Sequence, residues 1–230
     1  MLVYGKNVAK DYLNCFCKNV RRILIHDNFN DKELISLIEK SKLPVKRLTN
    51  KEFEKLADGN HQGIILDVTD YNYFDIDVAL DSKLIVILDH LEDPHNFGAI
   101  IRTCEAAGID CIIIPADRSV QVNATVMKTS AGALTRMKIV KVPNLVNFID
   151  KLKKNSFWIV GTSMVGTDYR KINYDGKMAL VIGNEGKGVS NVVSKACDFI
   201  ASIPMNGEIN SLNASVAAGI MVYEMIRNRK

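Results

Sequence analysis

The chain has 230 residues, of which 47% are hydrophobic and 24% are charged, as is ordinary for a globular protein with one large or two small domains. Its formal net charge of +4 permits an anionic partner but does not by itself indicate one. No apolar run could span a bilayer, no signal-peptide pattern opens the sequence, and the five cysteines and four histidines follow no disulfide or metal-ligand spacing. Composition therefore favours a cytoplasmic protein that holds no metal and contacts no membrane.

Helical and strand patterns alternate over the first seventy residues. Periodic apolar residues predict helices around 8–16 and over 31–40, where Asp31 is a plausible N-cap, and another helix starts near Thr49. Short apolar runs at 22–26, 43–48 and 63–67 predict strands. These elements predict a small α/β domain over residues 1–70. The segment 71–81 fits neither period well and is expected to be a linker.

Longer apolar runs follow from residue 82 to residue 230. The run 83–89 (KLIVILD) is typical of a strand that is buried on both faces of a parallel sheet. Similar runs recur at 111–114, 139–142, 157–161, 178–183 and 199–203, with helical patterns between several of them. This alternation predicts an α/β domain with a mostly parallel sheet and helices on both faces. Ligands bind beyond the carboxyl ends of such strands, so the loops that follow them are where chemistry is expected.

Three of these loops have unusual sequences. LEDPHNFG (91–98) leads into a helix that carries Arg102, GNEGKG (183–188) forms a tight turn with a carboxylate, and IPMNGEINSLN (203–213) precedes the last helix. The glycine turn lacks the spacing of a Walker A loop, and no G-x-G-x-x-G follows the first long strand. A nucleotide-triphosphatase site and a dinucleotide-binding site are therefore disfavoured.

The last of these loops combines a strand end with a helix start. Pro204 has no N–H for a ladder, so a strand should end at Ile203. Ser211 stands where a helix N-cap is expected, ahead of a predicted buried face formed by Leu212, Val216, Ile220 and Tyr223. Small residues between these positions (Ala214, Ala217, Ala218 and Gly219) predict that the helix backbone packs closely against another segment.

Together the three loops resemble the sequence motifs of the SpoU family of RNA ribose 2′-O-methyltransferases, in the SPOUT superfamily. The matching segments are LDHLEDPHNFGAIIRTCEAAG (88–108), LVIGNEGKGVS (180–190) and IPMNGEINSLNASVAAGIMVYE (203–224), and VMKTSAGA (126–133) is similar to a further family segment. The resemblance covers about residues 77–230. One departure is Asn210, because many members have Glu directly before the serine.

The first seventy residues resemble the α/β/α substrate-binding domain of longer family members. This similarity rests chiefly on VYGKNVAKDYL (3–13) and on His61-Gln62-Gly63. The combination of both domains is most similar to the branch that methylates a guanosine ribose in 23S ribosomal RNA. The resemblance implies a domain over 1–70 that binds RNA and a methyltransferase domain over 82–230.

For the activity, the resemblance implies transfer of a methyl group from S-adenosylmethionine to a ribose 2′-oxygen in structured RNA. It also implies a homodimer with shared active sites and a deep trefoil knot in the second domain, which general rules of chain threading would not predict. The implied catalytic residues are Asn96, Arg102, Glu185, Ser211 and Asn213. The implied cofactor-binding residues are Gly183, Ile203 and Leu212, through main-chain groups, together with Thr162, Asn184 and Met205.

Other interpretations of these residues stay open. The substrate could be tRNA, or the chain could be a non-catalytic RNA-binding protein on the same fold, although no catalytic position is visibly damaged. An unrelated doubly wound dehydrogenase would need the glycine fingerprint that is missing here. Taken singly, a capping Asn, a solvated Arg, a turn Glu and a capping Ser are ordinary structural residues. Their occurrence together at family positions favours the enzyme.

Overall fold

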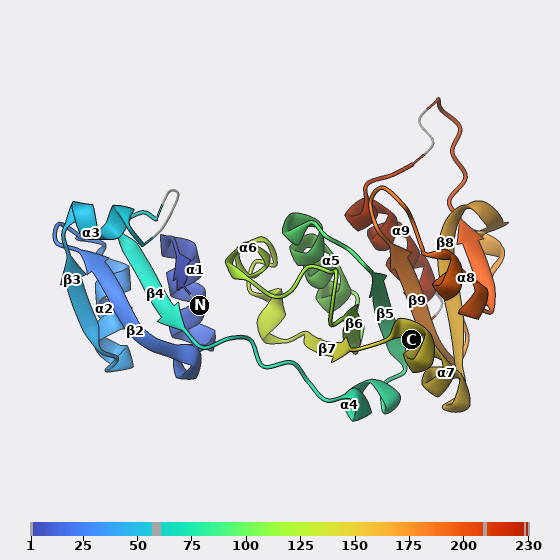
Figure 1. The fold of residues 1–230 in the computed structure, drawn as a ribbon, viewed down its shortest axis with the longest axis horizontal. Helices are drawn as coiled ribbons and strands as arrows, with labels where there is room; N and C mark the ends of the chain where they lie inside the picture. The colour runs from blue at the N-terminus through green and yellow to red at the C-terminus, as the bar shows by residue number, and fades with distance from the viewer. Residues whose placement is uncertain (1, 57–60, 209–210, 228, 230) are drawn as a thin grey trace. The chain divides into compact units, whose positions relative to one another are not determined.

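Two separate β-sheets organise the chain, and each belongs to its own compact unit (Figure 1). The computed structural model describes residues 2–56, 61–208, 211–227 and 229. The first unit comprises Met1–Asn72 together with Val122–Lys128, and the second comprises Tyr73–Gln121 with Thr129–Lys230. In the described part of the chain, no helix combines the length and the apolar character that crossing a membrane requires.

The first unit is built on a four-stranded sheet in the order β1-β4-β2-β3. The central strand β4 runs antiparallel to both neighbours, whereas β2 and β3 are parallel. The strands are β1 (Leu2–Tyr4), β2 (Val20–His26), β3 (Val45–Leu48) and β4 (Ile64–Val68), and the helices are α1 (Lys6–Cys15), α2 (Lys32–Ser41) and α3 (Asn50–Glu54), with a 3-10 turn at Cys17–Asn19. The predicted helices and the three predicted strands are confirmed. Strand β1 escaped prediction because three residues show no periodicity.

Side-chain caps start two of these helices. The Asp31 carboxylate accepts the N–H of Leu34 at the start of α2, as predicted. Thr49 and Glu52 form a capping box at the start of α3, in which the Thr49 N–H donates to the Glu52 carboxylate across 2.8 Å. Capping of this kind stabilises a helix end by about 0.5–2 kcal/mol. The caps therefore explain why two short helices begin where they do.

The second unit holds a six-stranded, entirely parallel sheet in the order β10-β8-β9-β5-β6-β7. Its strands are β5 (Leu84–Asp89), β6 (Cys111–Pro115), β7 (Lys138–Val142), β8 (Phe157–Asp168), β9 (Lys177–Gly183) and β10 (Phe199–Ser202). From β5 the chain builds outward through β6 and β7, and it then continues on the opposite side of β5. The strand order thus reverses between β5 and β9, which is where ligands bind in sheets of this kind.

Helices cover both faces of this sheet. On one face, inward residues of the strands form a core with Ala79, Phe148 and Val193, which come from α4, α7 and α8. Alternate strand residues such as Val86 and Leu88 are also fully buried, and α5 and α9 lie over that second face (Figure 1). The helices of this unit are α4 (Ile76–Leu80), α5 (Pro94–Ala106), α7 (Leu145–Lys154), α8 (Asn191–Ala196) and α9 (Ala214–Ile226), with 3-10 turns at Ala133–Thr135 and Tyr169–Lys171. The remaining helix, α6 (Ala124–Thr129), belongs to the first unit except for its last residue.

The predicted parallel sheet with helices on both faces is confirmed, whereas the trefoil knot stays a prediction. Within the segment 71–81, expected as a linker, residues 76–80 form α4 and place Ala79 in the core of the second unit. A five-residue helix, although four of its residues are apolar, is too short to show a helical period, which is why the pattern there was ambiguous.

The start and the buried face of α9 differ from the prediction. The N-cap is Asn213 and not Ser211, because the Asn213 side chain accepts the N–H groups of Ser215 and Val216. Val216 and Tyr223 are 50% and 52% exposed. The buried residues are Ala214, Ala218, Met221, Val222 and Met225. Helix α9 packs on α5, as expected, but a Cβ at Gly219 would lie at an ordinary contact distance of 3.9 Å from the Thr103 side chain, so the packing does not require glycine there. The packed face thus combines two alanines with two methionines and a valine, and it leaves Val216 and Tyr223 outside.

Candidate active site

The loops that follow β5, β9 and β10 meet at the carboxyl edge of the parallel sheet. Asp89 ends β5 and pairs in register with Gly183, which ends β9. The loop after β10 runs to the start of α9, and its residues 209 and 210 lie outside the described residues, so the departure at Asn210 cannot be placed. Hydrogen bonds connect these loops to one another. The site is therefore assembled at the point where the strand order reverses.

The glycine turn after β9 is held by its own hydrogen bonds. Asn184 and Gly188 exchange main-chain hydrogen bonds of 3.0 and 2.9 Å, and Asn184 Oδ1 accepts the N–H groups of Gly186 and Lys187. A Cβ on Gly183 would lie 2.1 Å from the carbonyl carbon of Gly188. Only glycine therefore fits at residue 183. The side-chain oxygen of Asn184, a predicted cofactor residue, is used within the turn.

A buried carboxylate anchors this turn to the loop after β5. Asp89 is 1% exposed, its Oδ2 accepts the Ser190 N–H across 2.7 Å, and its Oδ1 lies 2.6 Å from His90 Nδ1. Asn184 Nδ2 donates to the His90 carbonyl across 2.9 Å. Sequence reasoning missed Asp89. The sequence feature that could have identified it is an acidic residue directly after a buried apolar run, because a buried carboxylate needs hydrogen-bond partners.

A chain of hydrogen bonds links the helix cap of α9 to the carboxylate of the glycine turn. Asn213 uses its Oδ1 as the N-cap, which leaves its Nδ2 to donate to Asn96 Oδ1 across 3.0 Å. Asn96, which is 7% exposed, then donates from its Nδ2 to Glu185 Oε1 across 3.0 Å. The cap fixes which end of each amide faces which neighbour. Three of the five predicted catalytic residues are thus brought together, and Glu185 at the end of the chain is exposed.

The other two predicted catalytic residues are not connected to this chain of hydrogen bonds. Arg102 is exposed on α5, six residues after Asn96 and so about 120° away around the helix. Within the described part of the protein its side chain forms no hydrogen bond or ion pair. Ser211 is exposed in the loop before α9, also without a hydrogen bond to another described residue. Their roles stay predictions.

The remaining predicted cofactor residues surround the same loops. Thr162 donates its hydroxyl to the Val181 carbonyl across 2.9 Å, so this side chain ties β8 to β9. Met205 is 38% exposed and Ile203 and Leu212 are half-buried, all in the loop after β10. Leu212 forms no hydrogen bond with the described residues, which leaves its main-chain groups for a ligand. A tight glycine turn beside free peptide groups fits a ligand such as S-adenosylmethionine, whose adenine edge pairs with main-chain donors and acceptors.

Comparison with known families matches both units of the chain. Residues 83–223 match the SpoU rRNA Methylase family. Residues 2–74 match the family described as RNA 2′-O ribose methyltransferase substrate binding. The first match covers more than half of the chain and includes all three loops of the site.

Individual relatives agree with these matches. A protein of Staphylococcus saprophyticus assigned to the TrmH family of tRNA/rRNA methyltransferases is 40% identical over 240 residues, covering 100% of this chain and 96% of that protein. The crystal structure of the SpoU methyltransferase AviRb from Streptomyces viridochromogenes, in complex with AdoMet, superposes with a TM-score of 0.86 at 25% identity, covering 100% of this chain and 90% of that one.

The TrmH/SpoU tRNA modifying enzyme of A. aeolicus superposes with a TM-score of 0.59 at 34% identity, covering 67% of this chain and 80% of that one. The two family matches, the relative that spans the whole chain and the shared fold agree with the loops that the sequence singled out. This chain therefore belongs to the SpoU family of RNA methyltransferases, with the family's substrate-binding domain ahead of its methylase domain.

Proposed function

We propose that this protein methylates the ribose 2′-oxygen of a guanosine in 23S ribosomal RNA, with S-adenosylmethionine as methyl donor, in the cytoplasm. The observation that carries the proposal is the hydrogen-bond chain Asn213–Asn96–Glu185, which unites all three motif loops at the sheet edge. In this proposal residues 1–70 recruit the RNA and residues 82–230 perform the reaction. The substrate-binding domain favours a large structured RNA as the substrate.

The residues of the site can prepare the hydroxyl for attack. S-adenosylmethionine supplies an electrophilic methyl group when bound, and an attacking oxygen needs to lose its proton. Glu185 is held by Asn96 through one carboxylate oxygen, and the other is free of described partners. That second oxygen is the proposed proton acceptor. The Asn96 hydrogen bond orients the carboxylate, and positioning of this kind is a main source of catalytic rate.

Arg102 is suited to a different task. A guanidinium with a pKa above about 12 is a poor base at neutral pH, but its planar fork of donors binds phosphate or a developing alkoxide in a bidentate way. On α5 it lies on another side of the helix from Asn96. We therefore propose that Arg102 serves the active site of the partner subunit in a homodimer.

The outer face of α9 supports this dimer. Val216 and Tyr223 are seven residues apart, lie on the same side of the helix and are each about half exposed. Helix α9 packs on α5, the helix that carries Arg102. Light scattering should give about twice the chain mass of 25.6 kDa. A fully active monomer would exclude a shared site.

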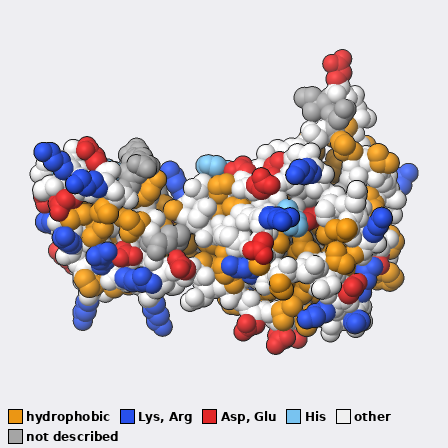
Figure 2. Space-filling model, in the orientation of Figure 1, with side chains coloured by type: hydrophobic (Ala, Val, Ile, Leu, Met, Phe, Trp, Pro, Cys, Tyr) orange, Lys and Arg blue, Asp and Glu red, His pale blue; other side chains and the backbone are white. Residues whose placement is uncertain are grey.

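The RNA-binding role of residues 1–70 rests on structure more than on charge. Residues 1–76 carry 12 basic and 11 acidic side chains, and on the visible face of the first unit the basic ones are interspersed with acidic and apolar ones (Figure 2). Such a surface suits recognition of RNA shape and unpaired bases better than purely electrostatic binding. Deleting residues 1–75 should therefore leave cofactor affinity intact and impair methylation of long RNA.

Ribose-methylation mapping in a deletion strain tests the proposed substrate. The strain should lack one 2′-O-methylguanosine in 23S ribosomal RNA, and the wild-type gene should restore it whereas Glu185→Gln should not. Loss of a methylated tRNA nucleotide instead would support the tRNA alternative, which the tRNA/rRNA description of the relatives also covers. If no ribose methylation changes in either RNA, the proposed activity is wrong.

A further inference from the structure

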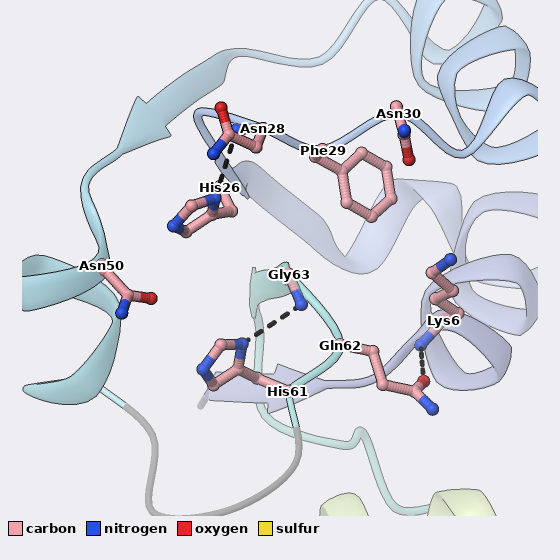
Figure 3. Close-up of a pocket in the computed structure, with 9 residues that line it drawn as sticks. All are labelled: Lys6, His26, Asn28, Phe29, Asn30, Asn50, His61, Gln62 and Gly63. Atoms are coloured by element: carbon pink, nitrogen blue, oxygen red, sulfur yellow. Dashed lines mark hydrogen bonds between the residues drawn. The ribbon is translucent and has the colours of Figure 1, made fainter.

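A pocket of about 300 Å³ opens on the first unit, in which none of the proposed catalytic loops takes part (Figure 3). Its walls come from the start of α1, the segment after β2, the first residue of α3 and the His61-Gln62-Gly63 segment before β4. That segment is one of the two that carry the resemblance of the first domain, and the methyl-transfer chemistry does not use it. Its volume is at the small end of the range for ligand sites.

The lining combines flat rings with primary amides. Three of the nine lining residues have rings (His26, Phe29 and His61), and four have amide side chains (Asn28, Asn30, Asn50 and Gln62). None of the nine is acidic, and Lys6 is the single one with a permanent positive charge. Figure 3 shows the two histidines and Asn50 around the same opening. The walls therefore offer ring faces together with donors and acceptors.

Both histidines are held in one tautomer and one orientation. His26 Nδ1 accepts the Asn28 N–H and His61 Nδ1 accepts the Gly63 N–H, each across 3.1 Å. In a neutral ring the proton then lies on Nε2, which becomes a donor. Both rings also pack against the buried Phe53, with centroids 5.8 and 4.8 Å away. The Nε2 of His26 is buried and has no partner among the described residues, so its ring contributes to the shape of the wall and its hydrogen-bonding capacity is unused.

The backbone around residue 62 is shaped to form this pocket. Gln62 has a φ of +51°, which is unusual for a residue other than glycine, and its Oε1 accepts the Lys6 N–H at the start of α1 across 2.8 Å. This bond directs the Gln62 amide donors away from the helix. A Cβ on Gly63 would lie 3.1 Å from the Phe29 ring and 3.6 Å from His26. Glycine therefore allows the Phe29 ring and the Cβ of His26 to lie close to the backbone at residue 63.

The chemistry of the lining excludes most ligand classes. A metal ion is disfavoured because both histidines already use Nδ1 and no carboxylate lines the pocket. An anion would find one cation, Lys6, which is already paired with Asp31 across 2.9 Å. A purely apolar ligand would bury the amides without partners. A nucleobase satisfies both halves of the lining, since its faces stack on aromatic or histidine rings and its edge bonds to amides.

We propose that this pocket binds one unstacked nucleobase of the substrate RNA, at a nucleotide other than the one that is methylated. The inference rests on the proposed function for its ligand, because it assumes that RNA is the substrate. His61 and Phe29 provide the ring faces, and Asn28 and Asn50 read the edge of the base. The first unit thereby recognises an unpaired position in the RNA fold, which helps to select the molecule to be methylated.

Side-chain NMR of the full-length protein tests the pocket directly. The chain has four histidines, of which His26 and His61 line the pocket and His90 and His95 lie in the other unit. With the cofactor site saturated by S-adenosylmethionine, AMP, GMP, CMP and UMP are titrated separately, with ribose 5-phosphate as the control. At least one nucleotide should shift the imidazole resonances of His26 and His61 saturably and leave the other two in place.

Matched variants check the role of the amides. Asn28→Ala with Asn50→Ala removes two exposed side chains and should weaken that binding about tenfold or more, whereas Asn14→Ala, exposed on α1 outside the pocket, should not. No saturable shift of His26 and His61 with any nucleotide would overturn the inference, as would equal shifts with ribose 5-phosphate. The titration does not depend on activity. Nucleotide binding without methylation of any RNA would remove the proposed function alone, and methylation without nucleotide binding would remove the pocket alone.

Discussion

Replacing Asn96 by aspartate would test the hydrogen-bond chain that joins the three loops. Asn96 Nδ2 donates to Glu185 Oε1 across 3.0 Å, and Asn96 Oδ1 accepts from Asn213. Asn96→Asp keeps the shape and the acceptor but replaces the donor by a second carboxylate oxygen. Because two carboxylates in contact repel each other, the pKa of the introduced carboxyl should rise above its unfolded value of about 3.9.

Coulomb's law bounds the size of this effect. Two unit charges separated by the 3.0 Å of this contact repel by about 5–6 kcal/mol at an effective dielectric constant of about 20, and by about 1.4 kcal/mol in bulk water. Glu185 is exposed whereas Asn96 is 7% exposed, so solvent screening reduces the repulsion. The expected loss in the free energy of unfolding is about 2–3 kcal/mol, which corresponds to a pKa rise of about two units.

The sign of the pH dependence follows from this rise. Below about pH 4 the introduced carboxyl is protonated in the folded and unfolded states and can still donate to Glu185, so little stability is lost. The loss should grow as the pH rises from about 4 to about 6, the expected folded pKa, and stay constant above it. Urea unfolding of the full-length protein across this range measures the profile.

A matched control isolates the contact. Asn147 occupies the third position of α7, as Asn96 does in α5, but is exposed, so Asn147→Asp should change stability by less than about 0.5 kcal/mol at any pH. Adding Glu185→Gln to Asn96→Asp should restore most of the lost stability. Parallel pH profiles for Asn96→Asp and Asn147→Asp would refute the reasoning, as would a double variant no more stable than the single one.

Gly183→Ala should abolish S-adenosylmethionine binding in calorimetry, because the added methyl group would lie 2.1 Å from the Gly188 backbone. As a control, Gly108→Ala, where the methyl group would enter open space at a positive φ, should lose only about 1 kcal/mol of stability. Normal cofactor affinity of the Gly183→Ala variant would contradict the proposed site. Arg102→Lys should lower kcat about 10²-fold, nearly as far as Arg102→Ala, with unchanged cofactor affinity. A lysine variant whose single-turnover rate recovers at high pH would instead identify the arginine as the base. Burial raises the pKa of the Cys111 thiol to about 11, so iodoacetamide at about pH 8 should label this cysteine only after the protein unfolds. Rapid labelling of Cys111 in the folded protein would contradict this expectation and would show that the sheet opens.

The parallel sheet was predictable because its strands are buried on both faces. The run from Leu84 to Leu88 consists of residues that are at most 9% exposed, so every position had to be apolar and the strand was visible without any periodicity. Helix α2, which begins after the capping residue Asp31, was predictable for a different reason, because its apolar residues recur with the helical period. In these elements the secondary structure that the local sequence favours is also the one that the packed fold requires.

The start of α9 was not predictable because two polar residues competed for its cap. Ser211 and Asn213 are both good N-cap residues, and tertiary contacts decide between them. Asn213 is selected because its Nδ2 bonds to Asn96, which lies far away in the sequence. Its buried face was misplaced because alanines carry little hydrophobic signal although they allow close approach to α5.

The candidate site could be located from the sequence, but its hydrogen-bond network could not be predicted. The rule that ligands bind at the carboxyl ends of parallel strands places Asn96 and Glu185 in neighbouring loops. Which amide donates to which neighbour depends on three-dimensional contacts between Asn213, Asn96 and Glu185. The hydrogen bond by which Asp89 anchors the glycine turn depends on such contacts as well. The position of Arg102 away from Asn96 follows from helix geometry alone, six residues being about 120° of rotation.

The order of strands in the second sheet has a consequence for biosynthesis. Central strand β5 is synthesised before its neighbour β9, which lies far downstream in the sequence. The edge of β5 that pairs with β9, where Leu84 lies opposite Met178, therefore stays unpaired until β9 has been synthesised. All four strands of the first sheet, in contrast, lie within the first 68 residues. Since domains fold as units while the ribosome elongates the chain, the first unit's sheet can form on a nascent chain that has no methyltransferase site. A chain arrested between β8 and β9 would therefore carry a folded RNA-recognition sheet without the means to modify what it holds.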